Sequence, residues 1–108
     1  MEIKQREVRG WRVLDITGEV MYMEIPYFME TLEAVEKVAG PGARIVLNFS
    51  ECGHVGSVGL GSVIMLNKRL RDSNGMLKII GLDETARFRL GQSGDDPPFV
   101  YIDSEDEI

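Results

Sequence analysis

The residues with the clearest chemical potential stand together between Cys52 and Gly61. This stretch holds the chain's single cysteine, its single histidine (His54) and the Gly-rich run Gly56-Ser57-Val58-Gly59-Leu60-Gly61. A serine at a helix start can cap the helix through its side-chain oxygen. The free N–H groups and positive dipole of the same helix start also favour a phosphate. Ser57 is therefore a candidate phosphate acceptor as well as a candidate cap.

Three motifs of nucleotide binding and hydrolysis do not fit this run. A P-loop needs Gly-Lys-Ser/Thr at its end, and a Rossmann fingerprint needs a different order of glycines. A nucleophile elbow needs Gly-x-Ser-x-Gly followed later by a histidine, but Val55 replaces the first glycine and His54 precedes Ser57. One Cys and one His supply at most two metal ligands. We therefore predict no catalytic residues, no metal and no cofactor, and an enzyme using Cys52 or His54 is the least favoured alternative.

Alternating and helical hydrophobic patterns predict the elements that position this run. Short apolar or alternating segments bounded by Gly, Pro and Asn indicate strands, and apolar residues at helical spacing indicate helices. Alternation of the two types along the chain predicts an α/β domain. The predicted strands are Ile3–Val8, Trp11–Thr17, Arg44–Phe49, Met76–Ile80 and Phe99–Ile102; the predicted helices are 26–39, 57–71 and Asp83–Leu90; the predicted loops include Ser50–Gly56 and Gly91–Pro98.

Length and composition describe one ordinary globular domain. The chain has 108 residues, of which 44% are hydrophobic, and a net charge of −6. A negative chain without a Lys/Arg surplus is unsuited to nucleic acid or to anionic membrane surfaces. No apolar run approaches the roughly 20 residues of a membrane helix. We expect a cytoplasmic protein with a domain over residues 1–103 and a mobile acidic tail over residues 104–108.

An apolar group follows Gly18, where the pattern predicts a loop. Met21, Tyr22 and Met23 stand there together with Ile25. Exposed Met-rich patches serve as adaptable binding surfaces. The alternative, which we favour at this stage, is that these side chains pack into the core.

The order of these segments resembles the STAS domain family, which includes anti-sigma factor antagonists and cytoplasmic domains of sulphate transporters. Three stretches carry the resemblance: Ile16-Thr17-Gly18-Glu19-Val20, Ile45-Val46-Leu47-Asn48-Phe49 and the Gly-rich run. They resemble the family's Thr-Gly-Glu-Leu-Asp, its central strand Ile-Val-Leu-Asn/Asp-Leu and its signature Asp-Ser-Ser/Thr-Gly-Leu-Gly. The implied fold is a mixed β-sheet of four to five strands with helices mainly on one face.

The resemblance also implies a function. The family's phosphorylated serine falls on Ser57, and the implied partner is an ATP-binding serine kinase that is also the anti-sigma factor; a homo-oligomer is a further option. The chain departs from the signature at Gly56, Val58 and Met21, which replace an acid, a hydroxyl residue and an acid. Its last helix is also shortened. The residues expected at the partner interface are Glu19, Met21, Tyr22, Met23, His54, Gly56, Ser57, Val58, Gly59 and Leu60.

Two other functions within the same resemblance stay open. One is a degenerate scaffold that is never phosphorylated and only assembles with proteins, which the departures at Gly56, Val58 and Met21 favour. The other is a small-ligand-binding module that uses the Gly-rich helix start as an anion site.

Overall fold

The computed structural model describes residues 1–92 and 98–108. These described residues form ten elements: β1 (Glu2–Val8), β2 (Trp11–Val20), η1 (Tyr22–Glu24), α1 (Ile25–Ala39), β3 (Arg44–Val55), α2 (Ser57–Asp72), β4 (Met76–Ile80), α3 (Glu84–Gln92), β5 (Val100–Ile102) and η2 (Glu105–Glu107). The family-type α/β architecture expected from the sequence is confirmed, with five strands in one sheet.

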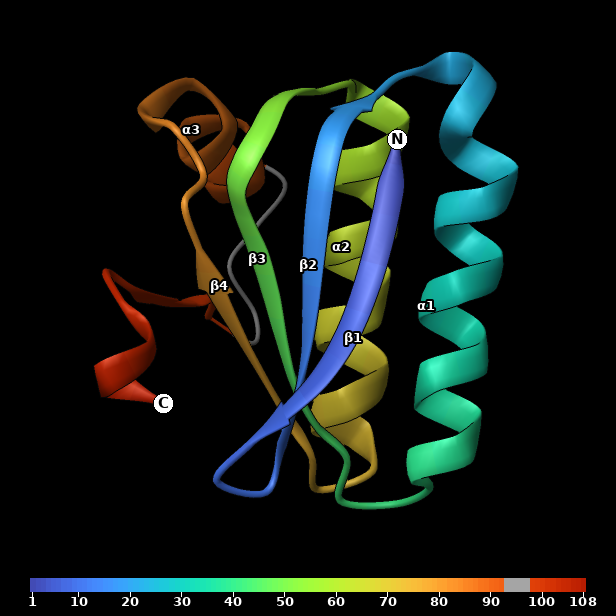
Figure 1. Ribbon diagram of the computed structural model, residues 1–108, viewed down its shortest axis with the longest axis vertical. Coiled ribbons are helices and arrows are strands. Elements are labelled where there is room, and N and C mark those ends of the chain that lie inside the picture. The colour runs from blue at the N-terminus through green and yellow to red at the C-terminus, as the bar shows by residue number, and fades with distance from the viewer. Residues whose placement is uncertain (93–97) are drawn as a thin grey trace.

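The sheet is mixed, and its order follows the chain. β1 and β2 form an antiparallel hairpin, and β2, β3, β4 and β5 pair in parallel. Parallel neighbours require crossover connections, which α1, α2 and α3 provide (Figure 1). As a result, the carboxyl ends of β2, β3 and β4 meet at one end of the sheet.

All three helices cover one face of the sheet. The main core lies between them, and it combines inward residues of the strands, such as Leu47 and Ile79, with Leu32 of α1 and Val63 of α2. These four side chains are at most 1% exposed, as predicted. Leu47 and Ile79 are direct register partners on β3 and β4. Leu90 of α3 belongs to the same core.

The opposite face of the sheet is covered differently. Trp11, Val13, Val46, Ile80 and Ile102 form a small second cluster there. The C-terminal residue Ile108 packs against it, and Arg6 of β1 donates a hydrogen bond to Glu105. The structure therefore places Glu105 and Ile108 against the sheet; the mobility expected of residues 104–108 stays a prediction.

Two strands are longer than predicted. β2 extends through Gly18 to Val20. Gly18 has a positive φ of 88°, and the pairing of β2 with β3 is irregular between Asp15 and Thr17 and between Gly18 and Val20. β3 continues to Val55, so the loop predicted over Ser50–Gly56 is wrong. Polar residues of β3 remain in a strand because β2 extends alongside them, pairing Val20 with Val55. The predicted loop Gly91–Pro98 falls mostly outside the described residues, and α3 runs through its first two positions.

Candidate functional site at the carboxyl ends of the strands

Ser57 is the first residue of α2, directly beyond the carboxyl end of β3. Gly56 separates the two elements and has an extended backbone, with φ −70° and ψ 167°. Its N–H donates to the Val20 carbonyl at 2.9 Å, and its own carbonyl accepts from the Leu60 N–H at 3.0 Å. These two bonds fix the strand-to-helix turn and leave Ser57 exposed.

The capping role considered for Ser57 is wrong. The N-cap of α2 is Gly56, and no side chain makes a capping hydrogen bond at this helix end. The first N–H groups of a helix lack partners within the helix. Gly56 has no side chain that could accept hydrogen bonds from them. The family signature has an acid at this very position, where a carboxylate would be a good cap.

The rest of the Gly-rich run divides between the surface and the core. Val58 is 57% exposed, whereas Leu60 is 3% exposed. Gly59 is buried against the strand ends: a Cβ built on it would lie 2.9 Å from Cγ1 of Val20 and 3.0 Å from Cγ1 of Val55. Glycine at this position therefore lets α2 begin close to the sheet.

The Met-rich segment is exposed, so the core packing favoured from the sequence is wrong for Met21, Tyr22 and Met23, whereas Ile25 does pack against the main core. Tyr22 and Met23 are each 83% exposed, and Met21 is 43% exposed. Met21 directly follows Val20, whose carbonyl holds Gly56. The irregular end of β2 and the short η1 lead the chain here from the carboxyl end of β2 to α1. The sequence alone could not distinguish this turn from a core segment.

The remaining predicted interface residues lie on the same end of the sheet. Glu19 and His54 are exposed. Glu19 lies beside Gly53, because a Cβ on Gly53 would stand 3.4 Å from the Glu19 Cγ. The structure thus gathers at one end of the sheet the residues singled out from the sequence, although they come from β2, η1, β3 and α2.

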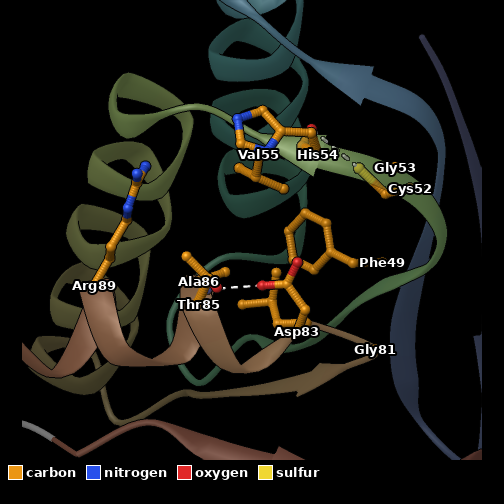
Figure 2. A pocket seen from close by; sticks show the side chains of 11 residues that line it. Phe49, Cys52, Gly53, His54, Val55, Gly81, Asp83, Thr85, Ala86 and Arg89 are labelled. Carbon is orange, nitrogen blue, oxygen red and sulfur yellow. Dashed lines mark hydrogen bonds between the residues drawn. The ribbon is translucent and has the colours of Figure 1, made fainter.

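A small pocket opens next to this site (Figure 2). It has a volume of about 80 Å³ and is lined by the end of β3, the β4–α3 turn and α3. Asp83 caps α3 by accepting a hydrogen bond from the Ala86 N–H at 2.8 Å, as predicted. Thr85 and Arg89 line the pocket beside His54, and sequence analysis missed them. The topology could have indicated these residues, because β3 and β4 are adjacent parallel strands whose carboxyl ends lie at the same end of the sheet.

Cys52 in this pocket is not set up as a nucleophile. Burial raises the pKa of its thiol, which disfavours the reactive thiolate. Its Sγ contacts the backbone carbonyl of His54, at 3.7 Å, rather than an imidazole nitrogen. Within residues 1–92 and 98–108, no three His, Cys, Asp or Glu side chains are grouped to hold a metal. The pocket geometry therefore gives no support to chemistry at Cys52 or His54.

Comparison with known proteins places this geometry in a family. A model of the STAS domain matches residues 2–107 of the chain. No curated protein matches it. In the same residue ranges that the structure describes, no helix is long and apolar enough to cross a membrane.

Solved structures with the same fold include anti-sigma factor antagonists. One from Mycobacterium paratuberculosis has a TM-score of 0.79 at 21% identity, over 98% of this chain and 88% of that one. The Bacillus cell fate determinant SpoIIAA in its phosphorylated form has a TM-score of 0.72 at 20% identity, and the match covers 98% of this chain and 95% of that one. An RsbS variant from Moorella thermoacetica has a TM-score of 0.72 at 17% identity, and the match covers 98% of this chain and 90% of that one. At these identities the likeness establishes the fold.

Proposed function

This chain belongs to the STAS domain family, and we propose that it is a cytoplasmic, non-catalytic regulatory module of the anti-sigma factor antagonist type. Its partner is an ATP-binding serine kinase that is also the anti-sigma factor. Phosphorylation of Ser57 switches the binding of this partner. Solved relatives with the same fold are described as anti-sigma factor antagonists, and one is described in a phosphorylated form.

The observation that carries the proposal is the position of Ser57. It is an exposed residue at the start of α2, at a helix end without a side-chain cap. A phosphate would add about −1.5 to −2 charges at pH 7 and three acceptor oxygens. The positive end of the helix dipole tolerates that charge, so the fold should not change. A partner surface beside Ser57, however, would meet a dianion in place of a neutral hydroxyl.

The neighbourhood of Ser57 suits protein binding. Met21, Tyr22 and Met23 are exposed on the turn that follows Val20, and Val58 is exposed beside Ser57. Apolar side chains grouped on a surface mark interaction sites. A phosphate placed among them would oppose the desolvation that docking requires. Binding by the unphosphorylated form and release of the phosphorylated form follow from this arrangement.

A second function, a scaffold that is never phosphorylated, is favoured by two features of the same turn. Gly56 supplies no carboxylate beside the hydroxyl, and Val58 presents a branched apolar side chain where the signature has a second hydroxyl. The scaffold also uses the exposed surface, but it predicts no transfer of phosphate.

The deciding experiment is intact-mass measurement after incubation with ATP and a candidate ATP-binding serine kinase. We expect the wild type to gain one phosphate and Ser57→Ala to gain none. Ser50→Ala, which removes another exposed hydroxyl on β3, is the matched control and should gain one phosphate. Ser57→Asp should bind the kinase more weakly than wild type while keeping the native circular dichroism spectrum. No mass gain in any protein would leave the scaffold as the better description, and equal gain in wild type and Ser57→Ala would place the acceptor elsewhere.

A further inference from the structure

Most of the exposed large hydrophobic side chains of the described residues lie on or next to η1, α1 and α2. Two of them, Val38 near the end of α1 and Phe88 on α3, lie apart from the others. Met21 precedes η1, Tyr22 and Met23 lie on it, and three others line the facing sides of α1 and α2, namely Met29, Val58 and Met65; Tyr27 lies two residues before Met29, on the other side of α1. Monomeric proteins rarely expose such groups unless they serve an interface.

A groove between α1 and α2 continues this region along the outer surface of the helices. Its volume is about 440 Å³. Met29 and Leu32 line it from α1, and Val58 and Met65 line it from α2. Leu32 is 1% exposed, whereas Met29 and Met65 are 40% and 52% exposed. The groove therefore has a buried apolar residue within it and two flexible, polarizable side chains at its surface, which can adapt to a ligand.

Gly61 keeps the groove open. A Cβ built on this residue would meet no atom within 4 Å, so packing within the domain does not require glycine there. Glycine in a helix interior costs roughly 0.5–1 kcal/mol relative to alanine. Arg69, which also lines the groove, forms an ion pair with Glu36, with Nε and Oε1 2.9 Å apart.

The charge at the groove favours a basic occupant. Glu33 lines the groove, and Glu30 is exposed on the same helix. Neither forms an ion pair with another residue of the described ranges. The chain as a whole carries −6. If a second copy of the chain occupied the groove, the acidic α1 helices of the two copies would face each other, and repulsion between their like charges would disfavour that association.

We propose that the α1–α2 groove binds an amphipathic helix of the protein partner, with apolar side chains at i, i+3 or i+4 and i+7 and with Lys or Arg along one flank. The proposal rests on the proposed function in that the occupant belongs to that partner. Val58 and Arg69, near the two ends of the groove, are separated by about 16 Å of helix, which is about three turns. A ridge of side chains on a third helix fits between two packed helices.

Ser57 lies next to the apolar end of this groove. Val58, the residue after Ser57, lines the groove from α2. The acidic Glu33 lines it from the other helix, α1. A phosphate on Ser57 would therefore stand where the bound helix places apolar side chains. Docking would then require desolvation of a dianion against apolar side chains, a cost that opposes its attraction to the Lys or Arg flank.

The test uses the full chain and three synthetic helical peptides of 18 residues as probes. All share the same apolar stripe; one has Lys flanks, one has Glu flanks, and one has a scrambled order. We expect the Lys peptide to bind at least about tenfold more tightly than the Glu peptide at low salt. Methyl NMR of the methionines locates the site: Met29 and Met65 should shift, and Met76, in the second cluster on the other sheet face, should not.

Two variants complete the design. Gly61→Leu fills the groove in a position with free space and should weaken binding of the Lys peptide by at least about tenfold, without lowering the melting temperature, because it removes a glycine from a helix interior. Val38→Gln, on the exposed part of α1 away from the groove, is the control and should bind like wild type. Equal binding of the Lys and Glu peptides, undiminished binding by Gly61→Leu, or a shift of Met76 alone would overturn the proposal. Self-association that Gly61→Leu abolishes would assign the groove to a second copy instead.

These outcomes are separate from those of the phosphorylation test. Phosphate transfer to Ser57 without peptide binding would overturn the groove and leave the proposed switch in place. Peptide binding at the groove without phosphate transfer would support the groove and remove the switch.

Discussion

Gly59 and Val20 are so close that a Cβ on the glycine would lie 2.9 Å from Cγ1 of the valine. Val20 ends β2, and its carbonyl also accepts the hydrogen bond from Gly56. The first turn of α2 is therefore held against the strand ends by one backbone bond and one close packing contact. This relationship determines where the Ser57 hydroxyl stands relative to the Met21–Met23 turn.

Gly59→Ala should destabilise the protein by about 1–3 kcal/mol, because the new methyl group overpacks against β-branched side chains that have little freedom to move. Gly61→Ala is the matched control in the same helix. Its new Cβ meets open space, so it should stabilise the protein by roughly 0.5–1 kcal/mol. Urea denaturation of both variants measures the two effects. A stabilised Gly59→Ala would mean that α2 does not begin as close to β2 as described.

Leu47→Ala should cost about 2–5 kcal/mol, because it opens a cavity at the centre of the main core. Leu47 is fully buried and is the register partner of both Leu14 and Ile79. Val38→Ala, at a position 86% exposed, should change the unfolding free energy by less than about 0.5 kcal/mol. Similar denaturation midpoints for Leu47→Ala and wild type would contradict the assigned core.

Acid stability should depend on Asp15, which lies between two donors. Arg6 Nε donates to its Oδ2 at 2.6 Å, and Asn48 Nδ2 donates to its Oδ1 at 2.8 Å. The hydrogen bond from Arg6 is the main cause that lowers the pKa of Asp15. A lowered pKa stabilises the folded state above the unfolded value of about 3.9, and this contribution disappears as pH falls through the folded value.

Asp15→Asn should therefore lower the unfolding free energy at pH 7 by on the order of 1 kcal/mol, since the pair is partly exposed. The difference from wild type should shrink as the pH falls below about 4. Glu2→Gln is the control, because Glu2 pairs with Lys4 at 3.5 Å where both side chains are well exposed. A difference for Asp15→Asn that is constant between pH 7 and pH 3 would show that ionisation of Asp15 is not its source.

The core could be predicted from the sequence because its signal is local. Period-two patterning at Val13 to Ile16 and the apolar run at Ile45 to Leu47 indicated strands directly. The extension of β3 to Val55 could not be predicted, because its polar residues are held in a strand by the neighbouring β2. Likewise, the four acidic or polar residues that precede Ile108 gave no sign that Arg6 would pair with Glu105 across 99 positions of sequence.

The candidate site was partly predictable for the same reason. Ser57 could be placed at a helix start from the glycines around it, but its capping role was assigned one residue too far along. The distinction between Gly56 and Ser57 as N-cap depends on a backbone turn fixed by the Val20 carbonyl, which lies on another strand. Met29 and Met65 carried a weak signal, namely methionines at outward helical positions, whose meaning depends on the packing of α1 beside α2.

Restoring the acid of the family signature tests whether its loss matters. Gly56 has the extended backbone typical of an N-cap, and a Cβ there would lie 3.4 Å from the Val20 carbonyl oxygen, so aspartate fits. Gly56→Asp should stabilise the protein by roughly 0.3–1 kcal/mol at pH 7, because its carboxylate accepts a free N–H of α2 and faces the positive end of the helix.

Gly56→Asn separates the two contributions. The asparagine amide oxygen can cap the helix but carries no charge. Gly56→Asn should therefore raise the unfolding free energy less than Gly56→Asp does, and by the same amount at pH 7 and pH 3. The increase for Gly56→Asp should decline as the carboxylate is protonated. Thermal unfolding at both pH values measures this. If the acid also orients the acceptor hydroxyl, Gly56→Asp should accept phosphate on Ser57 faster than wild type in the kinase assay, and Gly56→Asn should not. Equal rates in all three proteins would mean that the glycine affects the helix end alone and that the loss of the signature acid is no obstacle to phosphorylation.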